Sequence, residues 1–455
     1  MAPGAPPRWR RRASPVDRLA LPRHTATTAH LCAVYPFTIE AGLGSRGVFL
    51  GHNRLAGGGF FFDLHEAYDA GLIQGPNMVV SGAGAHGKSA LIKAYLHRAA
   101  ARTPAGGRPR FTAVIDPKGE WTALADRLGW AALRLRPGGG IRVNPLDAGP
   151  GQHPAADSPT QTTRRAAVTG ALLAVALGQG ELSVSQQRLV TAAVRRAAAR
   201  TPTPTLLDIR AVLAHPDPTL AADLDTTPGE LLDRRRPLLD ACVTLVDHDL
   251  RGICDGPTSI GLAWDTTPGL VLDLSALLTN RRALKLVLTA AAGWLQAVMY
   301  GQPDRHKLTV IDEGWIALDD LAIVRFLQDQ WRLGRQWGAA NILITHAIAD
   351  LRGQVHADRA EASIAAGLLN TTSVRVFLHQ NPEQIGRLLT DMGLTSTEAA
   401  LLDGFPPFTA LWQVGGHTAL VDHVIAADEW AFADTDTAMR TSIPGNTDTS
   451  GYRER

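Results

Sequence analysis

The sequence has little cysteine, little lysine and almost no net charge, and each shortage excludes a class of protein. Its three cysteines, Cys32, Cys242 and Cys254, show no metal-ligand spacing and are too few for a disulfide framework, which favours a reducing, cytoplasmic compartment. The basic residues are nearly all arginine, and a formal net charge of +2 argues against a chain dominated by polyanion binding. The 45% of hydrophobic residues is ample material for a globular core.

Long apolar runs are missing as well. No segment is both long and apolar enough to cross a bilayer, and the stretch from Leu284 to Tyr300 carries Lys285 and Gln296, which predicts a buried helix. Residues 1–30 are rich in arginine and proline and lack the apolar centre of a secretory signal. We expect them to form a disordered basic leader, with contact to acidic lipid or nucleic acid as the alternative.

The most informative segment is a glycine-rich turn at residues 82–89, which follows the apolar stretch Asn77–Ser81. It has the G-x-x-x-x-G-K-[ST] spacing of a phosphate-binding loop, set between a predicted strand and a predicted helix. Glycine lets consecutive backbone N–H groups turn inward around an anion, and the following helix directs its positive end to the same place. A simple glycine turn at a strand–helix junction is the alternative.

The loop therefore predicts a nucleotide-binding site in which each part has a separate task. Lys88 is expected to reach the β- and γ-phosphates, and the hydroxyl of Ser89 to hold Mg²⁺. The expected nucleotide-binding residues are Gly82, Ala83, Gly84, Ala85, His86, Gly87, Lys88, Ser89 and Ala90.

Asp312 and Glu313 predict the second half of a hydrolytic site. They follow an apolar run at 308–311, which predicts a strand with two carboxylates at its carboxyl end, beside the phosphate loop. Asp312 is the candidate Mg²⁺ ligand, and Glu313 is the candidate base that orients and deprotonates water. Two solvated acids at a strand end are the alternative. Because the sequence has neither an N-K-x-D guanine element nor a protein-kinase catalytic loop, we expect an ATP hydrolase.

Short apolar runs separated by helical stretches predict a mainly parallel sheet in an α/β fold. These runs lie at 111–116, 269–273, 308–312, 341–345 and 373–378. Residues 31–74 predict short strands or hairpins, and Gly415-Gly416 between two apolar runs predicts a β-hairpin. Alanine, leucine and arginine at helical spacing predict an all-α insertion at 149–261. The expected domains are a leader at 1–30, a core at 31–148 and 262–430, the insertion, and a loose tail at 431–455.

Three further motifs lie between the phosphate loop and the Asp312-Glu313 pair, and together the motifs follow one order: Asp116-Pro-Lys-Gly-Glu120, Asn144-Pro-Leu-Asp147, Asp273-Leu-Ser275 and Asp312-Glu313-Gly-Trp315. With the phosphate loop, the set resembles the ATPase domain of conjugative-transfer and type IV secretion ATPases of the TraC kind, in the HerA–FtsK branch of P-loop motors. The resemblance runs from Thr28 to Asp428. It implies a RecA-like P-loop NTPase core that carries the helical insertion and the C-terminal hairpin.

The resemblance also implies ATP sites at subunit boundaries of a hexamer or a dimer, each completed by an arginine of the neighbouring subunit. Arg335 is the candidate, because it precedes His346 by eleven residues, as the arginine of related motors precedes a polar sensor. Arg332 competes for this role, and Arg375 and Arg387 are outside candidates. The family usually has glutamine where this chain has His346, whose imidazole can also hydrogen-bond a γ-phosphate or the attacking water. A solvated arginine and a structural histidine are the alternatives.

Glu120 is a further candidate, because the acidic motif at 116–120 is characteristic of the family. In that interpretation Glu120 assists the water or Mg²⁺. Equally, Asp116 caps a turn and Glu120 opens a helix, so both interpretations stay open.

The expected function is a Mg²⁺-dependent ATPase motor that energises conjugative DNA transfer or type IV secretion. A DNA-translocating coupling protein or a HerA-like DNA pump would use the same residues, and a nucleotide-gated assembly scaffold with little hydrolysis is an alternative of another class. The expected partners are further copies of this chain, channel proteins and, for the pumps, DNA. Many relatives carry a large N-terminal docking domain, whereas few residues precede the phosphate loop here. We therefore expect a cytoplasmic protein that reaches the inner face of the membrane through partners.

Overall fold

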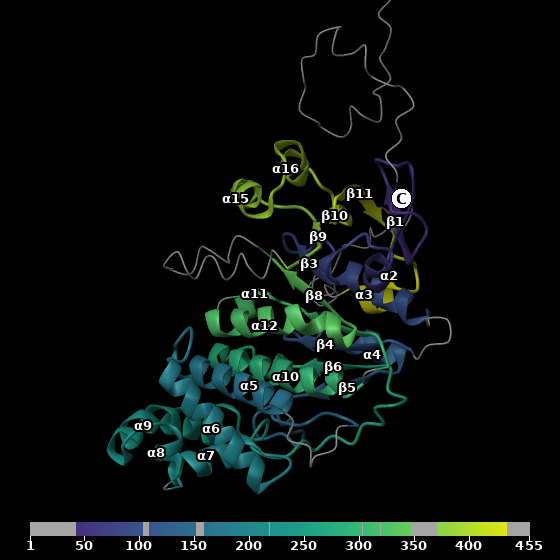
Figure 1. The fold of residues 1–455 in the computed structure, drawn as a ribbon. Coiled ribbons are helices and arrows are strands. Elements are labelled where there is room, and N and C mark those ends of the chain that lie inside the picture. The colour runs from purple at the N-terminus through teal and green to yellow at the C-terminus, as the bar shows by residue number, and fades with distance from the viewer. Residues whose placement is uncertain are drawn as a thin grey trace, which may run out of the picture.

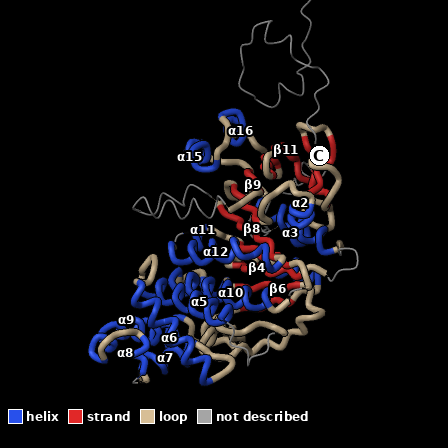
Figure 2. The backbone as a smooth tube through the Cα atoms, viewed as in Figure 1, coloured by secondary structure: helices blue, strands red, loops and turns tan. Residues whose placement is uncertain are grey.

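The structure, a computed structural model, describes residues 42–102, 109–151, 159–217, 219–302, 304–318, 320–346 and 371–434. A large sheet crosses the molecule with helices on both of its faces (Figure 1). The helices of residues 159–244 gather at one end of the molecule. Figure 2 separates these helices and strands by colour. The leader expected at 1–30 lies outside the described residues, and so does the tail expected at 431–455 except for residues 431–434. Of these, residues 431–433 belong to the short helix α17 (Trp430–Ala433) and are not loose chain.

The described residues contain one sheet of eleven strands in the order β2-β1-β11-β10-β9-β3-β8-β7-β4-β6-β5. From β9 to β5 every neighbouring pair is parallel, whereas β2, β1, β11 and β10 form an antiparallel edge. The strands are β1 (Val48–Asn53), β2 (Gly58–Phe62), β3 (Asn77–Ser81), β4 (Phe111–Asp116), β5 (Ala131–Arg134), β6 (Gly269–Asp273), β7 (Lys307–Ile311), β8 (Ala339–Thr345), β9 (Val374–Phe377), β10 (Thr409–Val414) and β11 (His417–His423). The predicted α/β class and the mainly parallel sheet are therefore confirmed.

Successive side chains of the parallel strands enter two cores, one on each face of the sheet. Met78 and Val80 of β3 lie in the core that includes Leu91 of helix α3 (Lys88–Ala100). Val79 lies in the core that includes Leu286 of helix α10 (Arg281–Tyr300). Because both faces are covered, these strands are apolar at nearly every position, which is how their sequences predicted them.

Helices cover both faces of the sheet (Figure 1). One face carries α3 (Lys88–Ala100), α4 (Thr122–Leu128) and α17 (Trp430–Ala433), which pack on one another. The other face carries α10 (Arg281–Tyr300) and α12 (Leu321–Gly334), which contact β4 and β8 respectively. The other described helices of the sheet region are α2 (Leu64–Asp69), α11 (Trp315–Leu318), α15 (Pro382–Met392) and α16 (Ser396–Leu402), with 3₁₀ turns at Ser275–Leu277 and Arg335–Trp337.

The segment at 159–249 consists of helices joined by short loops, with no strand among its described residues, and it lies beyond α10 and α12, away from the sheet (Figure 1). Its elements are α5 (Pro159–Leu177), α6 (Val184–Arg200), α7 (Leu206–Ala214), α8 (Thr219–Asp223), α9 (Pro228–Thr244) and a π-helical turn at Leu245–Asp249. Helix α5 packs against both α10 and α12, and its side chains share one continuous core with them. The expected division into a core and an insertion stays a prediction, because this shared core has no boundary at α5.

Helix α10 is the buried helix that the sequence predicts at 284–300. Among the described helices it is the one long and apolar enough to span a membrane, with a mean hydropathy of 1.3, yet 89% of that stretch is buried inside the structure. Burial between the sheet and α5 accounts for its apolar composition.

The predicted C-terminal hairpin is formed by β10 and β11, which pair along their length. Gly415 and Gly416 make a two-residue turn, and Gly415 has a left-handed φ of 58°. A side chain at Gly415 would also meet the carbonyl oxygen of Leu72 at 2.2 Å. Glycine is therefore required there by both the backbone and the packing.

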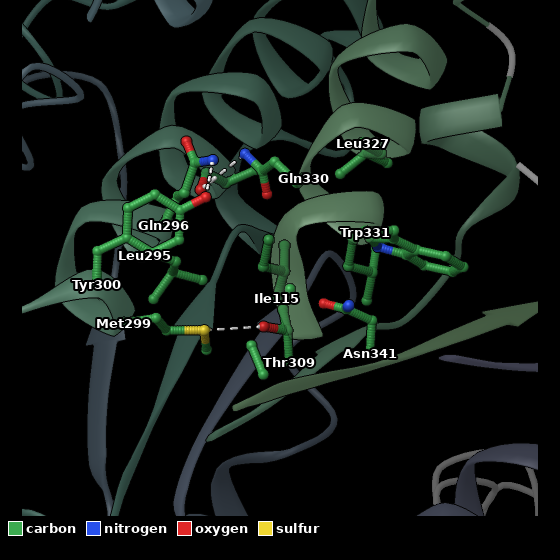
Figure 3. Close-up of a pocket in the computed structure, with 14 residues that line it drawn as sticks. Ile115, Leu295, Gln296, Met299, Tyr300, Thr309, Leu327, Gln330, Trp331 and Asn341 are labelled. Atoms are coloured by element: carbon green, nitrogen blue, oxygen red, sulfur yellow. Dashed lines mark hydrogen bonds between the residues drawn. The ribbon is translucent and has the colours of Figure 1, made fainter. Parts of the chain in front are cut away.

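A small cavity lies between α10, α12 and the sheet (Figure 3). Its volume is about 30 Å³, which suits one water molecule and not a nucleotide. Gln296 donates a hydrogen bond to the hydroxyl of Tyr300 at its rim, and Thr309 donates one to the sulfur of Met299. This cavity is a packing defect of the core, so the candidate nucleotide site must lie elsewhere.

Candidate functional site

The phosphate loop lies at the carboxyl edge of the parallel strands, between β3 and α3. Helix α3 begins at Lys88 with Gly87 as its N-cap residue, and no side chain caps it. The N–H groups of its first turn are therefore available to an anion, together with the positive end of the helix dipole. Within the loop, the N–H of Ala83 donates to the carbonyl of His379 at 2.8 Å, and His86 stacks on His379 with ring centroids 4.4 Å apart.

The three glycines of the loop differ in how strongly the surrounding structure requires glycine at their positions. Gly87 has a φ of 92°, and a Cβ atom there would meet the ring of Phe408 at 2.6 Å. A Cβ atom on Gly82 would meet the Cβ of Leu378 at 2.8 Å. Gly84 has no atom within 4 Å of that position. Gly82 and Gly87 are thus required by packing as well as by the loop geometry.

Lys88 is buried, and its ammonium group is folded back onto the loop. Its Nζ donates hydrogen bonds to the carbonyl oxygens of Gly82 at 2.8 Å and Ala83 at 2.9 Å, and lies 3.2 Å from Nδ1 of His346. Burial lowers the pKa of Lys88 to about 8, although the carboxylates of Glu313 and Asp312 oppose that shift. The lysine is therefore still cationic at neutral pH, as a phosphate ligand must be.

Asp312 follows the end of β7 and is only 3% exposed. Its Oδ2 accepts hydrogen bonds from the indole N–H of Trp121 at 2.7 Å and from the hydroxyl of Ser89 at 3.4 Å. Burial raises the pKa of Asp312 above its ordinary value. The two predicted metal ligands, Ser89 and Asp312, thus lie side by side.

This pair of oxygen donors fits Mg²⁺. Among the described residues there is no group of three or more histidine, cysteine or acidic side chains that could hold a metal alone. Mg²⁺ is usually bound by one or two protein oxygens and completes its octahedron with substrate phosphates and water. In such a site the protein supplies only a few oxygen ligands, and the carboxylate of Asp312 and the hydroxyl of Ser89 beside the phosphate loop match that number.

Glu313 is held in an unusual backbone conformation. Its φ is 50°, in the left-handed region that costs a non-glycine residue about 1–2 kcal/mol. Two hydrogen bonds hold this turn: the N–H of Glu313 donates to Oδ1 of Asp312 at 2.9 Å, and the N–H of Gly314 donates to the carbonyl of Ile344 at 2.7 Å. Strain of this kind clusters at functional sites, where the surroundings impose it.

Three donors surround the carboxylate of Glu313. Its Oε1 lies 2.5 Å from Nζ of Lys118 and 3.1 Å from Nε2 of His346, and its Oε2 accepts from the indole of Trp315. Burial alone would raise the pKa of Glu313, but the hydrogen bonds from His346 and Lys118 outweigh it and lower the pKa to about 2. The carboxylate is therefore ionised at neutral pH, as a base must be.

His346 occupies its position because β8 lies between β3 and β7 in the sheet. The residue follows the carboxyl end of β8 and places one ring nitrogen toward Lys88 and the other toward Glu313. Since the ammonium group of Lys88 can only donate, Nδ1 accepts and Nε2 carries the proton that Glu313 accepts. The sequence predicts His346 as a site residue, and the structure brings it into contact with both catalytic candidates.

The turn at 116–121 contributes two residues whose roles the sequence analysis did not identify. The carboxylate of Asp116 accepts hydrogen bonds from the N–H groups of Lys118, Gly119 and Trp121, and burial raises its pKa to about 6. This anchored turn directs the side chain of Lys118 to Glu313 and that of Trp121 to Asp312. Lys118 lies inside the acidic motif at 116–120 and Trp121 directly follows it, and this closeness to Asp116 in the sequence is the signal that could have identified them.

Glu120 lies in the same turn, and its role stays a prediction. Its peptide carbonyl accepts a hydrogen bond from the buried Lys93 at 2.7 Å. Burial raises the pKa of the Glu120 side chain, while Lys118 and Lys93 act in the opposite direction. The side chain of Glu120 therefore lies within electrostatic range of the charged groups of the candidate site, Asp312 and Glu313 among them.

Arg335 lies at the opposite edge of the sheet from the phosphate loop. It precedes β8, is exposed, and donates from Nη1 to the carbonyl of Gln74 at 3.1 Å. The seven residues of β8 span roughly 23 Å at 3.3 Å per residue, so Arg335 cannot reach Lys88 of its own chain.

The competing arginines are dispersed. Arg332 is exposed on α12 and lies 3.9 Å from Asp329, and Arg375 on β9 donates to the carbonyl of Met392 at 2.7 Å. Arg387 lies on α15. Neither Arg332 nor Arg375 contacts Lys88 or Glu313 among the described residues, so the assignment of a neighbour's arginine stays a prediction.

Gly87→Ala is expected to destabilise the fold by more than about 1 kcal/mol, because it adds left-handed strain to a clash with Phe408. It should also weaken nucleotide binding, since Lys88 is the next residue. The matched control is Gly84→Ala, which meets no atom and should stay within about 0.5 kcal/mol. Urea unfolding of both variants measures the difference, and equal losses would show that the loop conformation is wrong.

Comparison with known proteins adds structural relatives. The sequence matches no protein-family model and no curated protein. VirB4 of Thermoanaerobacter pseudethanolicus is similar in structure, with a TM-score of 0.64 and 18% identity over 86% of this chain and 99% of the other. The plasmid coupling protein TrwB in complex with ADP and Mg²⁺ gives 0.53 and 16% over 86% and 94%, and unbound TrwBdeltaN70 gives 0.51 and 17% over 77% and 85%. The chain thus has the RecA-like P-loop fold that the motifs predict, shared with VirB4 and TrwB.

Proposed function

We propose that this chain is a Mg²⁺-dependent ATPase motor that energises conjugative DNA transfer or type IV secretion from the cytoplasmic side of the membrane. One observation carries the proposal: Lys88, His346 and Glu313 form a continuous hydrogen-bonded row from the phosphate loop to an ionised carboxylate. A binding module needs the loop alone, whereas hydrolysis also needs a base beside the terminal phosphate.

The residues divide the work as follows. The N–H groups of the loop and of the first turn of α3 receive the phosphates, and Lys88 leaves the carbonyls of Gly82 and Ala83 to bind them. Ser89 and Asp312 would hold Mg²⁺, which would supply positive charge against the transferring phosphate. Glu313 takes the proton of the attacking water, and His346 keeps the carboxylate oriented.

The structural relatives support ATP and Mg²⁺ as the ligands. TrwB has been solved with ADP and Mg²⁺ and with a non-hydrolysable ATP analogue, as well as with a GTP analogue. These ligands belong to TrwB, and their transfer to this chain rests on the shared fold and on Lys88, Ser89 and Asp312. The absence of an N-K-x-D element favours ATP over GTP here.

Arg335 supports the idea of sites at subunit boundaries. It lies exposed at the edge of the sheet opposite its own phosphate loop, so it can act on ATP only in a neighbouring copy. Head-to-tail packing of these two edges closes into a ring when the rotation between copies allows it. A hexamer or a dimer of this kind is part of the proposal, with channel proteins as further partners.

Glu313→Gln should lower ATP turnover at least about 100-fold, because the amide cannot accept the proton of water. Affinity for ATP should change little, since Lys88 and the loop are intact. Steady-state hydrolysis and equilibrium binding of a fluorescent ATP analogue measure the two effects. The control is Glu181→Gln, an exposed acid that pairs with Arg325 away from the site. Unchanged turnover in Glu313→Gln contradicts the assignment of the base.

Arg335→Ala should abolish hydrolysis, and mixing should restore it. In a mixture with Lys88→Ala subunits, about a quarter of head-to-tail boundaries combine an intact phosphate loop with an intact Arg335 of the neighbour. Each variant alone is expected to be inactive, and the mixture is expected to hydrolyse ATP. The comparison variant is Arg332→Ala, which should remain active alone. Normal hydrolysis by Arg335→Ala alone removes this arginine from the mechanism.

A DNA-translocating coupling protein or DNA pump is the second candidate, favoured by the likeness to the conjugative coupling protein TrwB. Single- or double-stranded DNA should then stimulate ATP turnover strongly. Turnover is a better measure than DNA binding, because contacts with phosphates make binding depend on salt in any basic protein. No stimulation favours a secretion or assembly ATPase, and ATP binding without any turnover favours a nucleotide-gated scaffold.

A further inference from the structure

Lys118 forms the shortest ion pair of the candidate site. Its Nζ lies 2.5 Å from Oε1 of Glu313, the same oxygen that lies 3.1 Å from His346. The second oxygen of Glu313 accepts from Trp315. In this arrangement Oε1 accepts from two protein donors, which take both of its acceptor sites, so that oxygen has no place for a water molecule.

The backbone beneath Lys118 is fixed, whereas its side chain is not enclosed. Asp116 accepts hydrogen bonds from the N–H groups on both sides of the turn, and Gly119 packs closely on Ser275 with a left-handed φ of 76°. The side chain of Lys118 is 40% exposed, whereas that of Glu313 is 7% exposed. The ammonium group can therefore swing on four rotatable bonds about a stationary turn.

Lys118 also lies near the place where a terminal phosphate would bind. Its charge is close enough to that of Lys88 to lower the pKa of Lys88, and Asp312 acts on both lysines. Both ammonium groups rest on protein oxygens, Lys88 on two loop carbonyls and Lys118 on a carboxylate. A triphosphate brings stronger anionic acceptors between them.

We propose that Lys118 senses the γ-phosphate: it pairs with Glu313 when the site holds no triphosphate, and it moves to the γ-phosphate oxygens when ATP binds. The inference rests on the proposed function, since it needs a triphosphate in this loop. The exchange frees Oε1 of Glu313 for the attacking water while His346 still holds the carboxylate. A diphosphate lacks these oxygens, so it leaves Lys118 on Glu313 and the base restrained.

The test compares Lys118→Met with Lys118→Arg. Lys118→Met should weaken binding of a non-hydrolysable ATP analogue about tenfold while MgADP affinity stays within about twofold, because one charged hydrogen bond to the γ-phosphate is lost. Its kcat should fall at least about tenfold, with a smaller change in KM. Lys118→Arg keeps the cation and should recover most of the preference for the triphosphate and most of kcat.

The control is Arg54→Met, which removes another half-exposed cation from an ion pair, that with Asp422 at 2.5 Å, on the antiparallel edge of the sheet. Its 37% exposure is close to the 40% of Lys118, and it should leave both affinities and kcat unchanged. Equal weakening of MgADP and the ATP analogue by Lys118→Met overturns the inference, as does an unchanged or increased kcat. If the wild-type chain binds ATP without hydrolysing it, the proposed function fails, and the two affinities still decide the role of Lys118.

Discussion

The parallel insertion of β8 between β3 and β7 is the constraint on which the candidate site depends. Parallel strands all end at the same edge, so the phosphate loop after β3, His346 after β8 and Glu313 after β7 lie in one row. An imidazole in the middle position spans the gap with one ring nitrogen on each side. With β7 directly beside β3, Lys88 and Glu313 would be neighbours and His346 would have no position between them.

The turn at 116–121 is the second feature that shapes the candidate site, because it supplies hydrogen-bond donors to Asp312 and Glu313. The carboxylate of Asp116 accepts hydrogen bonds from three backbone N–H groups of this turn, and these bonds fix the backbone positions from which the side chains of Lys118 and Trp121 extend. Each then supplies one donor to one of the paired acids, Trp121 to Asp312 and Lys118 to Glu313. The ammonium group of Lys118 and the indole of Trp121 thus stabilise two neighbouring buried carboxylates, whose mutual repulsion and loss of hydration would otherwise oppose their burial.

The two ends of β8 carry different halves of the proposed chemistry. His346 at its carboxyl end serves the site of its own chain, and Arg335 at its amino end faces away from that site. A rigid strand between them keeps the two residues apart whatever their side chains do. The geometry therefore makes an assembly of copies a requirement of any role that Arg335 has in hydrolysis.

The sequence alone predicted most of the strands and the residue types of the candidate site, because apolar runs, glycine spacing and strand-end acids are local signals, although it gave no sign of β5. These signals predicted the phosphate loop, Asp312 and Glu313, the family resemblance added His346, and the apolar runs indicated the parallel sheet and the hairpin. Strand order is not local, so only the tertiary structure decided that β8 separates β3 from β7. It also decided that Lys118, some two hundred residues before Glu313 in the chain, pairs with it. Such contacts depend on which strand ends become neighbours, and no spacing along the chain records that.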